Sequence, residues 1–182
     1  MQLNTFLAVA LALVHVCLGA VLCPNATSAN PGCEDAQALV DSGGHVQIGP
    51  PWTHIGAYAF RSNTAITSVL IQSTIETIGD GAFSLCGSLT EVTATGPGLL
   101  TVGYRAFDSC TALVSINRLL ESVETIGGYA FYNCRSLASA QLGGGLRRLE
   151  EFVFYDTALT SITIPDGVIA ISNGAFKLTD IV

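Results

Sequence analysis

The chain has 182 residues, 49% of them hydrophobic and 12% charged, which fits a single domain large enough to bury a core. It has 7 Lys and Arg residues against 14 Asp and Glu, giving a formal net charge of −7. Contact with phosphates requires a basic surface, and attraction to anionic lipid requires clustered Lys and Arg. The charge balance therefore argues against a nucleic-acid binder and against a polybasic membrane-surface protein.

The first 19 residues have the pattern of a secretory signal peptide. Residues 6–14 are all apolar, and Cys17 and Gly19 are the small residues at the two positions that direct cleavage after Gly19. The apolar run is shorter than the roughly 20 residues that a transmembrane helix needs, which disfavours the alternative of an uncleaved membrane anchor. We expect residues 1–19 to be removed and the mature chain to be secreted or displayed at the cell surface, without membrane insertion.

From about residue 52 onward the chain repeats itself. A motif of the form Ile-Gly-x-x-Ala-Phe recurs, and successive Phe residues are 23, 24, 24, 23 and 22 positions apart. A period of this length over six copies indicates stacked supersecondary units rather than a globular arrangement. We number the copies 1 to 6 by the Phe in each: Phe60, Phe83, Phe107, Phe131, Phe154 and Phe176.

Each copy has the same internal order. Eight positions before the Phe lies an apolar residue: Trp52, Ile75, Leu99, Val123, Leu146 or Val168. Three positions after the Phe of copies 1 to 5 lie Asn63, Cys86, Cys110, Cys134 and Thr157. An apolar residue then opens a short strand: Ile66, Leu89, Leu113, Leu137 or Leu159. The alternation that follows, as in residues 159–164, predicts a strand with one apolar face.

Each copy is too small to bury its apolar face alone, so the copies must stack on one another. Stacking places equivalent residues in columns about 4.8 Å apart, and each buried large apolar side chain contributes on the order of 1.5–3 kcal/mol. A Gly lies four positions before the Phe of copies 1 to 4, where we expect a tight corner or a positive φ. These glycines are Gly56, Gly79, Gly103 and Gly127.

The pattern resembles the BspA-like, Treponema-type leucine-rich repeat, whose signature is Ile-Gly-x-x-Ala-Phe-x-x-Cys-x-x-Leu followed by a strand and an Ile-Pro turn. The similarity covers residues 52–182, and residues 162–165 supply the strand and proline. It implies a right-handed leucine-rich-repeat solenoid of the α/β class. Short parallel strands would form its concave sheet, opposite an irregular, 3-10 or short helical convex side. Copy 5 departs from the signature at Glu150, Val153 and Thr157, and copy 6 is incomplete, so a fragment is one possibility.

Cys86, Cys110 and Cys134 fall in one column of the stack. Three such cysteines could suggest a metal site, but no His or second Cys lies at a ligand spacing such as Cys-x-x-Cys. The column resembles the position in leucine-rich repeats where a side chain satisfies backbone groups of a turn. Parallel side-chain vectors also oppose the torsion that a disulfide needs. We predict free, buried thiols and no cofactor or metal.

Residues 20–51 are expected to form an N-terminal segment and cap. A secreted context makes a Cys23–Cys33 disulfide the default expectation, and Asn25 begins a glycosylation sequon. A short helix over residues 34–41 and a first strand over residues 46–48 would cover the end of the stack.

Strand alternation assigns the candidate ligand-binding face. Small polar side chains at equivalent positions would line the concave sheet: Ser68, Glu91, Thr93, Ser115, Asn117, Ser139, Gln141, Ser161 and Thr163. Such extended surfaces are what repeat proteins use for binding. The alternative is that Ser and Thr merely suit solvent-facing strand positions.

Two other features stand out from the repeat. Tyr58, Tyr104 and Tyr129 recur two or three residues before a Phe, and we interpret them as half-exposed packing, with an aromatic ligand stripe as the alternative. Arg118 lies where neighbouring copies have apolar residues, which predicts a solvated bulge that turns this side chain outward.

The sequence lacks an HExxH motif, a G-x-S-x-G elbow and a P-loop, so we expect no enzyme. The resemblance implies a secreted or cell-surface module for adhesion, which would bind a protein or glycan, possible partners being a host cell surface or matrix. The alternatives are a surface-coat or cell-wall component assembling by solenoid stacking, or a truncated inactive fragment.

Overall fold

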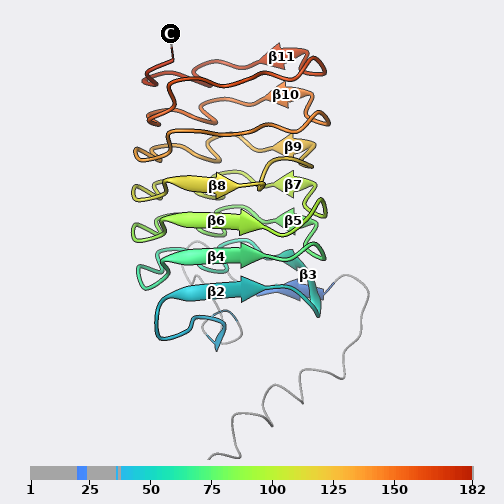
Figure 1. Cartoon of the computed structure of the whole chain (residues 1–182), viewed down its shortest axis with the longest axis vertical. Helices are drawn as coiled ribbons and strands as arrows, with labels where there is room; N and C mark the ends of the chain where they lie inside the picture. The colour runs from blue at the N-terminus through green and yellow to red at the C-terminus, as the bar shows by residue number, and fades with distance from the viewer. Residues whose placement is uncertain (1–19, 24–35, 37, 182) are drawn as a thin grey trace, which may run out of the picture.

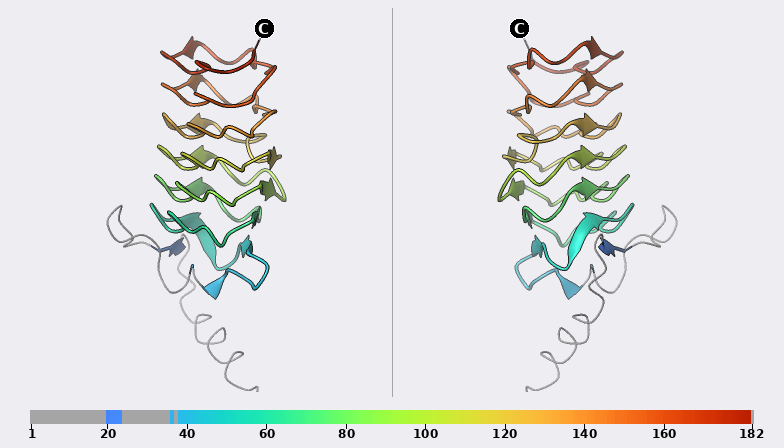
Figure 2. Two further views of the ribbon diagram at one scale, coloured as in Figure 1. Left: turned by 90° about the vertical axis from the view of Figure 1, so that its left-hand side faces the viewer. Right: turned by 90° about the vertical axis from the view of Figure 1, so that its right-hand side faces the viewer.

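The computed structural model of the protein describes residues 20–23, 36 and 38–181. The predicted signal peptide at residues 1–19, the sequon at Asn25 and Cys33 lie outside the described residues, so these predictions are not tested. Figures 1 and 2 show the copies as successive coils stacked along one axis. The predicted solenoid of short parallel strands is confirmed.

Two parallel sheets run along the stack. The front sheet, which faces the viewer in Figure 1, consists of β2 (His45–Ile48), β4 (Ser68–Ile71), β6 (Glu91–Ala94) and β8 (Ser115–Asn117) in that order. The rear sheet consists of β1 (Ala20–Leu22), β3 (Trp52–Ile55), β5 (Thr77–Ile78), β7 (Thr101–Val102) and β9 (Thr125–Ile126). A separate pair, β10 (Arg148–Leu149) and β11 (Ala170–Ile171), lies above it. Equivalent residues face each other in register, such as Ser68, Glu91 and Ser115.

The segment around each Phe, here called the turn segment, consists of consecutive turns and contains no helix among the described residues. In every copy the residues two before and two after the Phe have φ between 52° and 68°. Backbone N–H groups in these segments donate to the next copy: the N–H groups of Tyr58, Phe60 and Ser62 bond to the carbonyls of Asp80, Ala82 and Ser84 at 2.7–2.9 Å. Because these donors are used between copies, they cannot form the bonds within a segment that an α-helix requires.

The Phe side chains form the centre of the core. Phe83, Phe107, Phe131 and Phe154 are fully buried. Successive rings from Phe60 to Phe176 stack with centroids 5.0–5.8 Å apart and planes within 7° of parallel. This spacing is close to the distance between paired strands. The same distance between neighbouring coils therefore suits both the stacked rings and the hydrogen-bonded strands.

Of the two alternatives predicted for the glycines four before the Phe, positive φ is wrong, because among the described glycines it occurs only at Gly44, Gly81 and Gly174. Glycine is needed at these positions because the backbones of neighbouring coils approach each other closely. A Cβ on Gly127 would lie 2.5 Å from the nitrogen of Tyr104 and 2.7 Å from the carbonyl carbon of Gly103. Only a residue without a side chain allows the backbones to come this close.

The predicted strand over residues 159–164 is not a regular strand, and neither is its equivalent in copy 4. The front sheet ends at β8 because Arg118 adopts a φ of 58° and begins a turn whose Leu119 and Leu120 are buried. One backbone bond then crosses from this turn to the next coil, from Gly143 N–H to the Leu120 carbonyl at 2.9 Å. Arg118 is exposed and pairs with Glu121 at 3.0 Å, as its predicted outward bulge requires.

The first strand of the front sheet, β2, includes the predicted residues 46–48. Val40 pairs with Val46 in an antiparallel bridge, and Ala36 is buried. Of the described residues in the predicted helix over 34–41, Ala36 and Ala38 are helical, whereas Leu39 lies in a turn and Val40 in the bridge; Ala36, Leu39 and Val40 pack against the core as expected.

The close approach at Gly127 predicts a measurable effect on stability. Gly127→Ala places a Cβ against backbone atoms of the preceding coil, and overpacking of this kind costs about 1–3 kcal/mol. Gly87→Ala is the matched control, because a Cβ there meets no atom within 4 Å. Urea unfolding should show a clear loss for Gly127→Ala and little change for Gly87→Ala. Equal free energies of unfolding for the two variants would contradict the assignment.

Candidate binding surface

The candidate face is built by alternation along the strands of the front sheet. In β4 and β6 every second side chain is buried, namely Val69, Ile71, Val92 and Ala94, so the residues between them point outward. All nine predicted ligand-binding side chains lie on this outer surface or its continuation. Ser68, Thr93 and Ser115 are half-buried, and the others are exposed: Glu91, Asn117, Ser139, Gln141, Ser161 and Thr163.

In the part of the face formed by regular strands, the polar side chains bond to one another. One carboxylate oxygen of Glu91 accepts hydrogen bonds from the Thr93 hydroxyl at 3.1 Å and the Asn117 amide at 2.9 Å. The Ser68 hydroxyl lies 2.7 Å from Nδ1 of His45. These internal bonds fix the side chains and use part of their hydrogen-bonding capacity.

The continuation of the face in copies 4 and 5 is different. Among the described residues, no backbone hydrogen bond joins residues 139–142 to the coil on either side. A cavity of about 240 Å³ lies between these residues and β8, and its lining includes Ser115, Asn117, Ser139 and Gln141. A larger one of about 490 Å³ lies between residues 139–144 and 161–165. We call the two together the front groove.

The structure thus brings together six of the nine predicted residues in the front groove: Ser115, Asn117, Ser139, Gln141, Ser161 and Thr163. Glu91, Thr93 and Ser68 lie outside it. Sequence reasoning missed the backbone N–H and C=O groups of the groove, which are available because residues 139–142 and 161–164 do not pair as strands. The signal for them was present in three departures from the strand pattern, at Arg118, at residues 143–145 and at Pro165.

A second interruption lies behind the front groove. β9 and β10 are not paired, and a cavity of about 380 Å³ separates them. Its lining mixes acidic and basic side chains, including Glu124, Arg147, Arg148 and Glu150. Arg148 pairs with Glu150 at 3.4 Å, so charges of both signs are close together here. The cavity therefore has no single charge with which to select a ligand.

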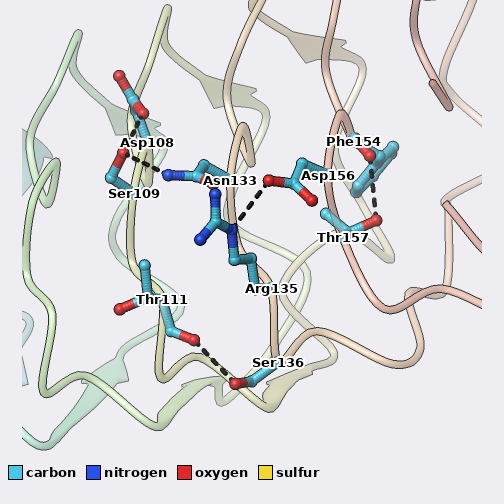
Figure 3. Close-up of polar contacts among 9 residues, drawn as sticks. All are labelled: Asp108, Ser109, Thr111, Asn133, Arg135, Ser136, Phe154, Asp156 and Thr157. Atoms are coloured by element: carbon cyan, nitrogen blue, oxygen red, sulfur yellow. Dashed lines mark hydrogen bonds and ion pairs between the residues drawn. The ribbon is translucent and has the colours of Figure 1, made fainter. Parts of the chain in front are cut away.

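Polar contacts along the turn segments join copies 3 to 5 where the two sheets are interrupted (Figure 3). Arg135 donates to Asp156 at 2.9 Å, and the Ser136 hydroxyl donates to the Thr111 carbonyl at 2.8 Å. The exposed ion pair itself contributes little, about 0–1 kcal/mol. Together with the continuing Phe stack, these contacts keep the coils adjacent on either side of the front groove.

The three column cysteines are free and completely buried, as predicted. The thiols of Cys86, Cys110 and Cys134 each donate to the Phe carbonyl of the preceding copy at 3.1 Å. Thr157 takes their place in copy 5, but its hydroxyl donates to the carbonyl of Phe154 in its own copy at 3.0 Å (Figure 3). The column is therefore structural. In the described part of the chain, no group of three or more His, Cys, Asp or Glu could bind a metal ion.

Burial keeps these thiols protonated. It raises the pKa of Cys86 to about 12 from an ordinary value of 9.0, and it also raises the pKa of Cys110 and of Cys134. A protonated thiol is neither a good nucleophile nor a metal ligand. Cys23 is disulfide-bonded, but its pairing with Cys33 stays a prediction because Cys33 lies outside the described residues.

Stacked coils, two parallel ladders and an internal Phe column define a leucine-rich-repeat solenoid. The family model described as BspA type leucine-rich repeat region matches residues 53–181 with 6 copies. The chain belongs to this family, as the resemblance in its sequence indicated.

Solved structures support the same assignment. The chain is 30% identical to a leucine-rich cell surface protein from Faecalibacterium prausnitzii, with a TM-score of 0.69, covering 76% of this chain and 40% of that one. It is 29% identical to a leucine-rich repeat protein from Bacteroides ovatus, with a TM-score of 0.66, covering 74% of this chain and 34% of that one. A leucine-rich repeat protein from T. pallidum has the same fold at 24% identity and a TM-score of 0.55, with 75% and 76% covered.

The chain spans well under half the length of the first two of these proteins. A comparison with curated proteins found no match. The family and fold are typical of repeat proteins that bind rather than catalyse. None of the described segments forms a helix long and apolar enough to cross a membrane.

The raised pKa of Cys86 predicts how stability depends on pH. The unfolded thiol loses its proton near pH 9, whereas the folded thiol keeps it until about pH 12. Its contribution is therefore fully present below pH 9 and is lost as the pH rises towards 12, at up to about 1.4 kcal/mol per pH unit.

Urea unfolding across this pH range should show a steeper fall in unfolding free energy for the wild type than for Cys86→Ala. The comparison of slopes cancels the contribution of other groups that titrate in the same range. Parallel slopes in the two proteins would contradict the assignment of a buried, protonated thiol.

Proposed function

We propose that this protein is a secreted or cell-surface adhesion module that binds a partner through the front face of its solenoid. The observation that carries the proposal is the front groove, where residues 139–142 and 161–164 present polar side chains together with unpaired backbone groups. Backbone N–H and C=O groups are strong hydrogen-bonding groups that favour a partner. A protein or glycan that supplies donors and acceptors along the groove would satisfy them.

Of the two classes, an extended protein segment matches the groove better. An added strand uses backbone groups for affinity and alternate side chains for specificity. The exposed Ser139 and Gln141 alternate along one coil, as do Ser161 and Thr163 along the next. Ser and Thr hydroxyls can both donate and accept, so they suit contacts with a partner's backbone.

The placement outside the cell rests on two arguments. The residues 1–19 have the signal-peptide pattern, and the similar protein from Faecalibacterium prausnitzii is described as a cell surface protein. A host cell surface or matrix is the kind of partner that such a location makes available. Catalysis has no role in this proposal, because the groove presents hydroxyl, amide, guanidinium and backbone groups without an acid–base pair or a nucleophile beside a base.

The test is binding of the purified mature chain to a panel of matrix proteins, glycans and intact cells. Ser139→Lys combined with Ser161→Lys places two bulky charges in the front groove. Thr125→Lys combined with Asn173→Lys makes the same charge change at exposed positions away from the front sheet. Both variants should keep the wild-type circular dichroism spectrum.

Saturable binding should weaken at least about tenfold, or about 1.4 kcal/mol, in the groove variant and stay unchanged in the control. Loss of binding in both variants would show that the partner does not bind specifically at the groove. Absence of saturable binding by the wild type to every member of the panel would count against adhesion.

A further inference from the structure

The outer surface of the turn segments carries a column of aromatic side chains. Tyr104 contacts Tyr129 with ring centroids 5.6 Å apart, and Tyr129 contacts Phe152 at 5.0 Å. The guanidinium of Arg105 lies 4.8 Å from the ring centre of Tyr129 and 5.5 Å from that of Tyr104. Aromatic and guanidinium groups in this arrangement stabilise one another through cation–π contacts. Tyr58 lies in the equivalent region of copy 1.

The column is interrupted in copy 2. The position two before the Phe holds Tyr58, Arg105, Tyr129 and Phe152 in copies 1, 3, 4 and 5, but it is Gly81 in copy 2. A hollow of about 250 Å³ lies beside Gly81 across the turn segments of copies 1 to 3, and the Tyr58 ring leans over Gly81, where a Cβ would come within 2.7 Å of it. We call it the copy-2 hollow. It lies outside the front face and is independent of the function proposed above.

The copy-2 hollow has a polar floor, and its rim combines apolar and charged side chains. Gly81, Ser84 and Asp108 are buried, whereas Leu85 and Tyr104 on the rim are 43% and 44% exposed. The rim and walls are completed by Tyr58, Arg61 and Arg105.

Two groups on the floor have hydrogen-bonding capacity for a ligand. Ser84 is 5% exposed, and no described residue forms a hydrogen bond with its hydroxyl. The Asp108 carboxylate accepts bonds from Arg105 at 3.1 Å and from Ser109 at 2.8 Å (Figure 3 shows the second). A carboxylate has about four lone-pair sites, so it can accept further hydroxyl donors.

This lining excludes several classes of ligand. Two guanidinium groups on the rim disfavour a cation, and the one carboxylate on the floor is already paired with Arg105 at 3.1 Å. An aromatic side chain would place its apolar edge against a polar floor, at the cost of leaving polar groups unpaired. The volume is below the roughly 300–1,000 Å³ of pockets for drug-sized ligands, so the occupant is small.

We propose that the copy-2 hollow binds a single sugar ring. The apolar faces of the ring contact the walls formed by Tyr58 and Tyr104, and its hydroxyl edge contacts Ser84 and Asp108. A sugar is neutral, carries hydroxyls that both donate and accept, and has apolar faces that suit the body of a tyrosine. Each property matches a separate feature of the lining.

The sharpest test fills the hollow with the side chain that other copies carry. Gly81 has a φ of 59°, and Tyr58 and Tyr129 adopt φ values of 58° and 59° at the same position, so Gly81→Tyr is compatible with the backbone. A Cβ there would lie 2.7 Å from the Tyr58 ring, which must rotate away. Gly174→Tyr is the matched control, because Gly174 is the equivalent residue of copy 6 and has a φ of 68°.

Binding is measured by saturation-transfer difference NMR with the methyl glycosides of glucose, galactose and N-acetylglucosamine. The wild type and Gly174→Tyr should bind at least one of them saturably. Gly81→Tyr should bind it at least about tenfold more weakly, because the new ring displaces the Tyr58 wall and takes up space in the hollow. Tyr104→Ala, which removes an exposed wall residue, should weaken binding in the same direction. If the circular dichroism spectrum shows that Gly81→Tyr does not fold, the result for Tyr104→Ala decides the test.

Tyr132→Ala controls for loss of an aromatic ring elsewhere, since Tyr132 stacks on Tyr155 and does not line the hollow. No saturable binding of any glycoside to the wild type would overturn the proposal. Equal binding by the wild type and the folded Gly81→Tyr variant would overturn it as well. Binding of N-acetyl-tyrosine amide instead of the glycosides, lost in Gly81→Tyr, would assign the hollow to a peptide and not to a sugar.

Discussion

The structure depends on contacts between equivalent positions of neighbouring copies in the turn segments. Phe rings stack at 5.0–5.8 Å, and N–H groups beside them donate to the carbonyls of the next coil. Two residues per copy adopt a left-handed backbone conformation, which costs a non-glycine residue on the order of 1–2 kcal/mol. The bonds between coils and the burial of one Phe per copy offset this cost, so no copy is stable without its neighbours.

This arrangement explains why the solenoid tolerates interruptions elsewhere. Both backbone ladders stop at the same level of the stack, between β8 and residues 139–142 and between β9 and β10. The turn at residues 118–122 begins where β8 ends and turns two leucines inward, and residues 139–142 of the next coil form no backbone bond to β8. The turn segments remain bonded across this level, from Phe131 N–H to the Val153 carbonyl at 2.9 Å.

The two candidate sites share an origin. Each lies where one copy departs from the repeat while its neighbours keep to it. The front groove follows the turn that begins after Asn117, and the copy-2 hollow lies beside Gly81, where copies 1, 3, 4 and 5 have a side chain. In a regular repeat, the side chains and backbone groups of one copy contact their equivalents in the next. Unpaired groups and hollows therefore become available to a ligand where a copy differs from the repeat pattern.

The sequence by itself determined the stack, its period, the buried Phe column, the free thiols and the outward direction of the nine polar side chains. These features follow from residue types that recur at a fixed spacing, and every copy adds evidence for the same pattern. The role of Gly127, the end of the front sheet at Asn117 and the hollow at Gly81 were decided only by the tertiary structure. Each depends on the distance between atoms of different coils, because a local pattern does not specify how closely two backbones approach or whether two strands pair.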